Sequence, residues 1–442
     1  MHLLVRSDRL AGTAQLRGAQ RHLGQAAAPF SAKKAFVKVL VVSEDVPYPN
    51  MGGLGKHALA LARALGQQSH IVDFMGNADQ VLVADDPDLK LPGRFFAELK
   101  GTQDGWKETR LGCFNPFKRP VIARGLASAI LARADDYDVV HYHGHFPNVA
   151  AYIPAHVNFV QTRHDQGSDC LIHTRFRNGE ICTETDPAVC AGCIAAQPNH
   201  VQRKVSTSAV RIFRKEVVAG FGRHKTIFVS DMLRRNFARS AGPGEWGTVV
   251  HNFLVTSQFK DVLSGRNARP QQDGKIEILI AAKLYPPKGV DQFLAAAAGK
   301  LPPHIHISIA GAGPDEEMLR GRFAGAQVSF LGWQDYPAII QLTASADAVV
   351  VPSVWEEPCA TTVLEALYLG RQVLALARGG TPELQGYVEA KSQLCLYSDM
   401  ASLVRGLTAV RRVDRASLGT GDEFSVERRL PELLQVYRAK NP

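Results

Sequence analysis

Among its 442 residues the sequence contains no run of about 18 apolar residues, which is the length that a membrane-spanning helix needs. It also lacks the N-terminal apolar core of a secretion signal. We therefore expect a cytoplasmic protein. Residues 1–35 carry six Lys or Arg and one acid, Asp8, so they form a basic leader. The leader suits an organellar transit peptide, but we favour a disordered extension or a start codon placed too early.

Cysteine is also scarce, with seven residues in the whole chain. An odd count without a secretion signal indicates reduced thiols rather than a disulfide scaffold. Four of the seven nevertheless fall within 24 positions: Cys170, Cys182, Cys190 and Cys193. This spacing, which ends in a C-x2-C pair, predicts a structural zinc site in which four thiolates leave no position for water. An iron–sulfur cluster and unliganded thiols are the alternatives.

The remaining composition is ordinary for a globular protein, with 45% hydrophobic and 21% charged residues. Lys and Arg (51) exceed Asp and Glu (42), but most of the surplus lies in residues 203–239, where ten basic residues face two acids. Val210, Phe213, Val217 and Phe221 recur there at helical spacing. A solvated helix is slightly favoured over a helix on an anionic membrane leaflet. No stacking platform supports nucleic acid as a partner.

Short Val- and Ile-rich segments alternate with amphipathic ones in both halves, which predicts an α/β fold with two Rossmann-like domains facing a central cleft. Strands are expected at 36–43, 70–74, 138–142, 159–162, 226–230, 276–281, 305–310, 328–331, 348–351 and 372–375. The domains are expected at 36–254, with a cysteine insert at 170–193, and at 276–420. A polar linker, 255–275, separates them, and residues 421–442 form a last amphipathic helix.

The most specific motif is residues 352–367, PSVWEEPCATTVLEAL, which follows a predicted strand and opens a helix. Backbone N–H groups and the helix dipole favour an anion at such a point, next to Cys359, Ala360, Thr361 and Thr362. Glu357 and Glu365 can accept hydrogen bonds from two sets of hydroxyls. A sugar joined to a nucleoside diphosphate presents its groups in this order. Alternatively, Thr361 caps the helix and Glu365 lies on a solvated face.

The Glu357-x7-Glu365 spacing resembles the E-x7-E motif of retaining glycosyltransferases with the GT-B fold, especially family 4. The resemblance covers residues 36–442. It implies that Glu357 holds the donor sugar and Glu365 the ribose, and that the final helix crosses back to the first domain. Pro358-Cys359-Ala360 replaces the usual Gly-rich stretch, and Pro358 has no N–H to donate.

Three further segments of the second half resemble landmarks of this family. Residues 282–289, AKLYPPKG, resemble the pattern whose two cations neutralise the donor pyrophosphate, which implies that role for Lys283 and Lys288. Lys283 stands where Arg is usual, so a point charge replaces a bidentate fork. Gly311 and Gly313 resemble the family's G-x-G-P turn near the nucleotide. Asp347 and residues 379–383 match further landmarks: we expect a structural role for Asp347, and the family places 379–383 near the donor.

In the first half, Gly52 and Gly53 begin the family's glycine loop, where backbone approaches the donor phosphate and the acceptor. Residues 162–165, TRHD, resemble a segment whose histidine lines the donor sugar pocket, which implies a catalytic role for His164. A subset of the family carries cysteines after this motif, as this chain does. His141, His143 and His145 lie where the family often has H-x-H-G, and spacing by two places them on one side of a strand. We interpret them as cleft and packing residues rather than a metal site.

A competing pattern is Gly53-x-Gly55-x-x-Ala58 with Asp73 twenty residues after Gly53, which formally fits a dinucleotide fingerprint. Its first glycine should lie in a tight turn directly after a strand, but Gly53 comes about ten residues later. An NAD-dependent oxidoreductase therefore ranks second. A non-catalytic zinc-bearing binding protein is a third interpretation.

The resemblance implies a retaining hexosyltransferase that moves a sugar from a nucleotide-diphosphate sugar, of UDP or GDP type, to a hydroxyl acceptor. The acceptor is expected to be a saccharide or a lipid-linked compound in cell-surface polysaccharide or glycolipid synthesis. No cofactor is expected for the chemistry, and zinc would be structural only. Peripheral contact with the inner face of the membrane is expected through residues 203–239.

Overall fold

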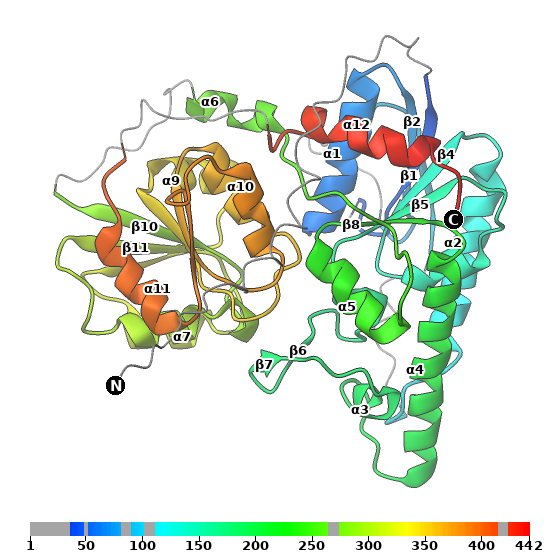
Figure 1. The fold of residues 1–442 in the computed structure, drawn as a ribbon, viewed down its shortest axis with the longest axis horizontal. Coiled ribbons are helices and arrows are strands. Elements are labelled where there is room, and N and C mark those ends of the chain that lie inside the picture. The colour runs from blue at the N-terminus through cyan, green and yellow to red at the C-terminus, as the bar shows by residue number, and fades with distance from the viewer. Residues whose placement is uncertain (1–35, 48–51, 81–89, 101–110, 264–273, 414–422) are drawn as a thin grey trace, which may run out of the picture. The chain divides into compact units, whose positions relative to one another are not determined.

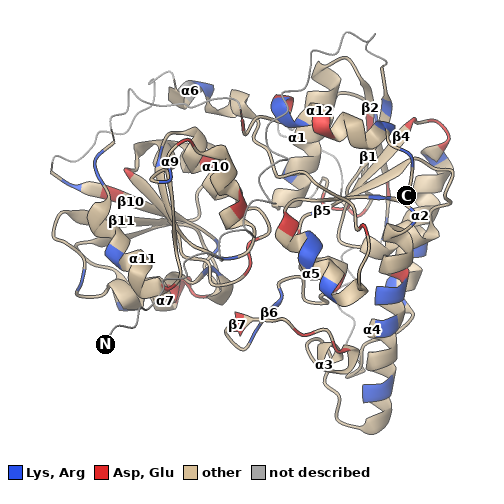
Figure 2. Ribbon diagram, in the orientation of Figure 1, with Lys and Arg blue, Asp and Glu red and all other residues tan. Residues whose placement is uncertain are grey.

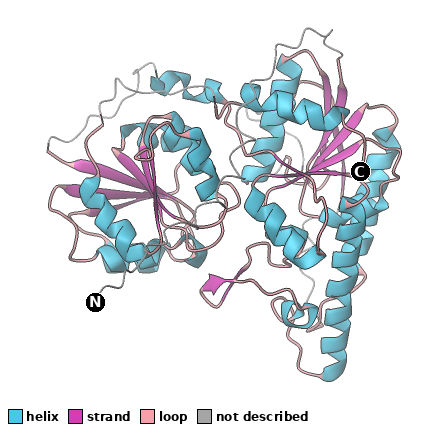
Figure 3. Cartoon of the chain, in the orientation of Figure 1, coloured by secondary structure: helices cyan, strands magenta, loops and turns pink. Residues whose placement is uncertain are grey.

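The computed structural model describes residues 36–47, 52–80, 90–100, 111–263, 274–413 and 423–442. Within these ranges, parallel strands form two separate sheets whose strands are joined by helices (Figure 1; Figure 3). The sheet of the first half has the strand order β3-β2-β1-β4-β5-β8-β9. Its strands are β1 (Lys38–Val42), β2 (Ile71–Asn77), β3 (Phe95–Leu99), β4 (Val139–His143), β5 (Phe159–Arg163), β8 (Lys225–Phe228) and β9 (Thr248–Val249).

The second half repeats this plan with the order β12-β11-β10-β13-β14-β15. In each sheet the order reverses beside the first strand, between β1 and β4 or between β10 and β13. Ligands of open α/β sheets bind at the carboxyl ends of the strands beside such a reversal. The strands are β10 (Ile276–Ala281), β11 (Ile305–Ala310), β12 (Val328–Gly332), β13 (Ala348–Val351), β14 (Gln372–Leu376) and β15 (Leu394–Tyr397). The predicted α/β class is confirmed.

Strand β1 shows why these sheets form, because its residues alternate between two cores. Val39 and Val41 pack with helices α1 (Gly53–Gln67) and α12 (Val426–Arg438) on one face. Leu40 and Val42 pack with α2 (Lys118–Ala134) on the other. A strand that is covered on both faces is expected to be apolar along its buried length, as this one is from Val39 to Val42.

Strand β10 divides the core of the second half in the same way. Ile278 and Ile280 face α7 (Val290–Ala297) and α11 (Met400–Gly406), whereas Leu279 packs on the side of α10 (Thr361–Tyr368). The other helices of this half are α8 (Glu316–Phe323) and α9 (Tyr336–Ser345). The first half also contains α4 (His200–Phe221) and α5 (Asp231–Ala241), and the short α6 (Lys260–Leu263) lies between the two sheets in sequence.

The last helix, α12, returns to the first sheet, as the family resemblance implied. Leu430 and Leu433 are buried against the core that contains α1. The hydroxyl of Tyr437 lies 2.8 Å from Nδ1 of His141 in β4, and Lys225 of β8 donates to the carbonyl of Ala439 at 2.8 Å. The helix is therefore fastened by both apolar packing and hydrogen bonds.

In the two parallel sheets the sequence missed three strands, β3, β9 and β15, and all three lie at an edge of a sheet. An edge strand has only one neighbour and is more exposed, so it carries no long apolar run. The basic leader, 1–35, and residues 264–273 of the predicted linker lie outside the described residues. The predicted domain limits stay predictions.

The basic stretch 203–239 contributes to two helices, α4 and α5, with β8 between them. Val210, Phe213 and Val217 of α4 are buried in the protein core, so this apolar face is not free to enter a bilayer. Lys and Arg residues are spread along the length of α4 (Figure 2). This arrangement fits a helix with a solvated charged face. Among the described residues, every helix is too short or too polar to span a membrane.

Candidate functional site

Glu357 and Lys288 form an ion pair at the carboxyl end of the second sheet. Lys288 ends the 3-10 turn Pro286–Lys288 after β10, and Glu357 lies in the loop after the neighbouring strand β13. Lys288 Nζ donates to Glu357 Oε1, and Ser353 Oγ donates to the same oxygen at 2.7 Å. Burial raises the pKa of Glu357, but the charge of Lys288 and these hydrogen bonds outweigh it and lower the pKa. The carboxylate is therefore ionised at neutral pH.

The turn after β14 fixes the backbone of Glu357. Gly380 N–H donates to the Glu357 carbonyl at 2.8 Å. Gly379 has a φ of +61°, and a Cβ at this position would lie 2.4 Å from the Glu357 carbonyl oxygen. Only glycine tolerates both the left-handed backbone and this close approach. The landmark 379–383 therefore positions Glu357 through its glycines.

Two other predicted landmarks have structural partners. The Glu383 carboxylate accepts hydrogen bonds from the backbone N–H groups of Asp231 and Met232, both at 2.7 Å, at the start of α5. The buried Asp347 accepts from the backbone N–H groups of Glu277 and Val413, at 2.8 and 3.0 Å. Both carboxylates thus hold backbone segments together.

Glu365 is buried inside α10 and does not lie on a solvated face. The Tyr336 hydroxyl, at the start of α9, is hydrogen-bonded to its carboxylate. Lys56 of α1 lies 5.6 Å from the centroid of the Tyr336 ring. Burial raises the pKa of Glu365 to about 7, although the Tyr336 hydrogen bond and the Lys56 charge lower it. The protonation state of Glu365 therefore changes close to neutral pH.

The start of α10 lies between these two glutamates in sequence. Cys359 and Ala360 are buried, Thr362 is partly buried and Thr361 is exposed. The N-cap residue is Ala360 and it makes no side-chain cap hydrogen bond, so the alternative in which Thr361 caps the helix is wrong. A helix start without a side-chain cap presents backbone N–H groups to an anion.

Lys283 lies two positions after the end of β10, and its Nζ lies 5.6 Å from the centroid of the Tyr285 ring. Its side chain is exposed and takes no part in the Lys288–Glu357 pair. A Cβ on Gly311 would lie 1.8 Å from the Ala282 carbonyl oxygen, and one on Gly313 would lie 2.1 Å from that of Leu284. The predicted nucleotide turn therefore packs directly against the segment that carries Lys283.

In the first half, His164 lies in a cluster of imidazoles with His57 of α1 and His143 of β4. His164 Nε2 lies 3.1 Å from His143 Nδ1, and the His57 and His164 ring centroids are 4.7 Å apart. Burial lowers the pKa of all three rings, that of His57 to about 3, so they are neutral at neutral pH. One nitrogen from each ring lies within 4.8 Å of the others, a spacing that a metal ion or a polyhydroxyl ligand could use.

Gly52 and Gly53 begin helix α1, with Gly52 as its N-cap residue. A Cβ on Gly52 would come no closer than 3.9 Å to a side-chain atom of Asp45, and one on Gly53 would meet nothing within 4 Å. Packing among the described residues does not require glycine here. A ligand that approaches the start of α1 would explain it.

The expectation that His141, His143 and His145 share one side is correct for the first two and wrong for the third. The His141 and His143 rings are 4.1 Å apart, but β4 ends at His143. His145 instead lies 2.9 Å from Asp45 Oδ1. Burial lowers the pKa of His145, but Asp165 and Asp45 outweigh it and raise the pKa to about 10. The second group of potential metal ligands is His145, Asp165 and His173.

The competing dinucleotide fingerprint is not supported by the geometry. Asp73 lies in the middle of β2 and accepts hydrogen bonds from Arg94 Nη2 at 2.8 Å and from the Tyr137 hydroxyl at 2.6 Å. Gly53 is the first residue of a helix rather than part of a tight turn at the end of β1. The carboxylate that would bind a ribose is thus engaged within the protein.

Two family models match the chain, one in each half. The model described as "Glycosyltransferase Family 4" matches residues 51–258, and the one described as "Glycosyl transferases group 1" matches residues 264–406. An uncharacterized glycosyltransferase of Methanocaldococcus jannaschii is 23% identical over 377 residues, covering 79% of this chain and 82% of that protein. The chain is a glycosyltransferase with the GT-B fold.

Solved structures agree with this fold. Anabaena HepE in complex with UDP-glucose aligns with a TM-score of 0.54 and 18% identity, covering 84% of this glycosyltransferase and 89% of that chain. Sucrose-phosphate synthase from Thermosynechococcus elongatus aligns with a TM-score of 0.58 and 18% identity, covering 91% and 98% of the two chains.

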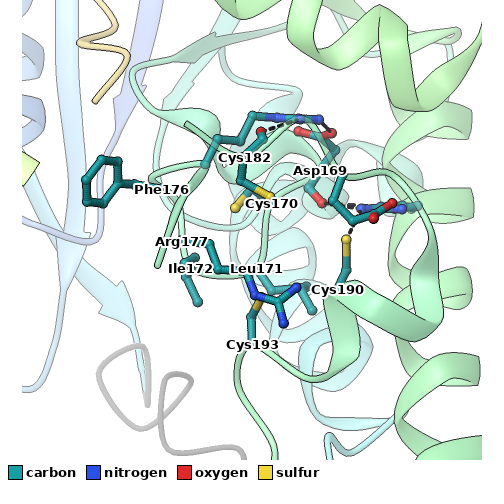
Figure 4. A pocket seen from close by; sticks show the side chains of 12 residues that line it. Asp169, Cys170, Leu171, Ile172, Phe176, Arg177, Cys182, Cys190 and Cys193 are labelled. Atoms are coloured by element: carbon teal, nitrogen blue, oxygen red, sulfur yellow. Dashed lines mark hydrogen bonds and ion pairs between the residues drawn. The ribbon is translucent and has the colours of Figure 1, made fainter. Parts of the chain in front are cut away.

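The four predicted metal ligands of the glycosyltransferase are free thiols that line one cavity (Figure 4): Cys170, Cys182, Cys190 and Cys193. Burial raises the pKa of the Cys170, Cys190 and Cys193 thiols. The cavity lies in the first half, apart in sequence from the Glu357 and Glu365 segment.

Sequence reasoning missed four residues that touch the predicted site: Lys56, His57, Tyr336 and Ser353. Ser353 lies four positions before Glu357, so the motif itself contained the signal. His57 lies near the start of α1, four positions after Gly53, so its closeness to the glycine loop in sequence was also a signal. Lys56 and Tyr336 come from opposite halves of the glycosyltransferase, and no local pattern reveals their contact.

Proposed function

We propose that the enzyme is a retaining glycosyltransferase of family 4 type that transfers a hexose from a nucleotide-diphosphate sugar to a hydroxyl acceptor. The ionised Glu357, paired with Lys288 beside the strand reversal of the second sheet, is the observation that carries this proposal. The neighbour HepE was solved with UDP-glucose, which supports a donor of UDP or GDP type.

In this proposal the donor lies along the carboxyl ends of β10 and β13. Glu365 accepts hydrogen bonds from ribose hydroxyls, and Glu357 from hydroxyls of the sugar. Lys283, Lys288 and the N–H groups at the start of α10 face the diphosphate, because cations and a helix N-terminus both stabilise anions. Gly311 and Gly313 allow the nucleotide to lie close to the backbone.

The reaction needs no carboxylate nucleophile. The acceptor oxygen forms a bond to the anomeric carbon on the face from which the nucleoside diphosphate departs. The bond from that carbon to the diphosphate breaks, and the acceptor proton passes to a phosphate oxygen of the leaving group. Lys283 and Lys288 stabilise the charge that develops on the diphosphate. His164, neutral because it is buried, can donate one hydrogen bond to a sugar hydroxyl or to the phosphate.

The test is to incubate the purified chain with UDP- and GDP-sugars and simple saccharide acceptors, and to determine the anomeric configuration of the product by NMR. A retained configuration supports the proposal, whereas an inverted one overturns the mechanism. Stabilisation by UDP, GDP or ADP in a thermal-shift assay identifies the base, because a bound nucleotide stabilises the folded state by mass action. NADH serves as the control for the oxidoreductase alternative, and absence of turnover with any donor would favour a binding protein.

The acceptor is proposed to be a saccharide or a lipid-linked compound of cell-surface polysaccharide or glycolipid synthesis, used at the cytoplasmic face of the membrane. Exposed basic residues of α4 support this location. Large apolar side chains on α4 and on the segment 111–121 are also exposed to solvent, with exposed fractions of 79% for Leu111, 71% for Phe117, 61% for Val121 and 69% for Val201. Gln202 of α4 donates to the Leu111 carbonyl at 3.1 Å, so the two segments are adjacent.

Sedimentation with lipid vesicles tests the membrane contact. We expect binding to vesicles that contain phosphatidylserine, weakened by salt, and little binding to phosphatidylcholine alone. Replacing Lys204, Arg211 and Lys215 with Ser should reduce it, whereas replacing the exposed Lys300 and Lys391 of the second half should not. Equal binding by both variants would contradict this part of the proposal.

A further inference from the structure

The cysteine insert (residues 170–193) is long but has little regular structure. It contains only the two-residue strands β6 (Phe176–Arg177) and β7 (Glu180–Ile181) and the five-residue helix α3 (Pro187–Ala191). Three of the four non-glycine residues with positive φ in the described chain also lie here: His173, Arg175 and Asn178. Such backbone conformations persist only where the surroundings hold them in place. The insert therefore needs a constraint that its own secondary structure does not supply.

Four cysteines from separate parts of this insert meet at one cavity (Figure 4). Cys170 follows the short turn η4 (Gln166–Ser168), Cys182 follows β7 directly, and Cys190 and Cys193 lie on and just beyond α3. The remaining three cysteines of the chain are elsewhere, so the convergence concerns more than half of all thiols. Spacing in the sequence and position in the fold thus select the same four residues.

The two acids of the cavity wall, Asp169 and Glu184, make hydrogen bonds within the protein. Asp169 forms an ion pair with Arg175 and accepts a hydrogen bond from Ser240. Glu184 accepts from the backbone N–H groups of Thr185 and Asp186, both at 2.7 Å.

Arginines surround the sulfur atoms. Arg214 Nη2 of α4 lies 3.1 Å from Cys190 Sγ, in hydrogen-bonding contact, and Arg177 also lines the cavity. Arg175 donates to the Cys182 carbonyl at 3.3 Å. A site of four thiolates and one divalent ion has a net charge of −2. Guanidinium groups and N–H···S bonds are the outer-shell contacts that stabilise such a site.

We propose that Cys170, Cys182, Cys190 and Cys193 bind one structural zinc ion that closes the cysteine insert. Four thiolates complete a tetrahedral shell, so no position remains for water or substrate. No three of these sulfur atoms lie within 4.8 Å of one another in the described chain, so binding draws the insert inward around the ion. The thiol protons are released to solvent as the ion binds.

The zinc ion would position the proposed transfer site without touching it. Shortly before the insert, Asp165 follows His164, and its Oδ2 lies 3.1 Å from Nδ1 of His173 in the insert. Arg175 of the insert donates to the carbonyl of Asn236 in α5, and Asn236 Nδ2 donates to Glu356, next to Glu357, at 2.7 Å. Loss of the ion is therefore expected to loosen contacts beside both halves of the site.

The experiment is elemental analysis of the full chain purified without added metal. We expect about one zinc per chain, and less than about a tenth of an equivalent in the double variant Cys190→Ser/Cys193→Ser. The matched control is Cys395→Ser, in β15, which should keep its zinc. These measurements need neither donor nor acceptor, so they are independent of the proposed glycosyl transfer.

A second measurement covers the case in which the double variant does not fold. A mercurial reagent is titrated into the wild-type chain while a coloured chelator reports free zinc, and release is expected as about four thiols react. Replacement by Co²⁺ should give the intense visible absorption of a tetrahedral thiolate site. A chain without zinc, iron with sulfide in place of zinc, a disulfide among these four cysteines, or zinc retained by a folded double variant would each overturn the proposal.

Discussion

Lys288 and Glu357 lie 69 positions apart in the chain, yet the lysine ammonium donates a hydrogen bond to the glutamate carboxylate. Their contact follows from strand order, because the loops after the paired strands β10 and β13 leave the same edge of the sheet. A charged pair at this edge can exchange partners when a sugar diphosphate arrives. Lys288 would then turn toward the diphosphate and Glu357 toward the sugar.

Replacing Glu357 with Gln should lower kcat/KM by about a hundredfold or more, because the group no longer carries the charge that the proposed sugar contact uses. Lys288→Ala should have a similar effect and should also leave Glu357 without its cation, which raises the pKa of that carboxyl. Steady-state kinetics with the active donor measure both effects. The exposed residues Glu389 and Lys300 provide the matched controls, Glu389→Gln and Lys300→Ala. Full activity in both site variants would contradict the proposed donor site.

Nucleotide affinity should weaken as the pH falls through about 7, because the pKa of Glu365 is raised to about 7 and the ribose contact needs an ionised acceptor. Calorimetric titration of UDP or GDP into the enzyme at several pH values between about 6 and 8 measures this dependence. Glu365→Gln should bind the nucleotide weakly and lose this part of the pH dependence. A pH-independent affinity in the wild-type enzyme would show that Glu365 does not contact the nucleotide.

The raised pKa of Glu365 also makes the stability of the folded state depend on pH. Since the folded pKa of Glu365 is raised above its unfolded value of 4.5, the folded state binds the proton more tightly between pH 4.5 and about 7. This contribution to stability is complete below pH 4.5 and is lost as the pH rises through 7. Urea unfolding measures the free energy of unfolding of the wild type and of Glu365→Gln across this window. After subtraction of the pH dependence that both proteins share, this free energy should decrease with rising pH in the wild type only.

Gly311→Ala should destabilise the second half by about 1 to 3 kcal/mol, because the new Cβ would lie 1.8 Å from the Ala282 carbonyl oxygen. Gly321→Ala in α8 is the control, since a Cβ there meets nothing within 4 Å and alanine favours a helix. Chemical denaturation compares the two variants. Equal stabilities would mean that the turn after β11 can move away from β10.

Removing the Leu430 side chain should destabilise the first half by about 2 to 5 kcal/mol, because this residue of α12 is fully buried. Tyr437→Phe should cost about 1 kcal/mol, because it leaves Nδ1 of the buried His141 without its partner. Glu427→Ala, on the exposed side of α12, is the control. Thermal unfolding that is unchanged by Leu430→Ala would show that α12 contributes nothing to the first half.

Central strands were the most predictable part of this fold. Residues 276–281, 305–310 and 348–351 were expected as strands, and β10, β11 and β13 have these bounds. Burial on both faces makes most positions of such strands apolar, which makes them visible in a sequence. The edge strands β3, β9 and β15 lack this constraint and were missed.

The sequence by itself determined the α/β class, the two repeated halves and the motifs that carry Glu357, Glu365, Lys288 and the four cysteines, because these depend on residue type and short spacing. Tertiary structure alone decided that Lys288 pairs with Glu357, that Lys56 and Tyr336 lie beside Glu365, and that His57 joins His143 and His164. Such contacts join residues far apart in the chain. They arise from the order of the strands in each sheet and from the loops that this order brings together, and a local sequence pattern encodes neither the strand order nor the loop contacts.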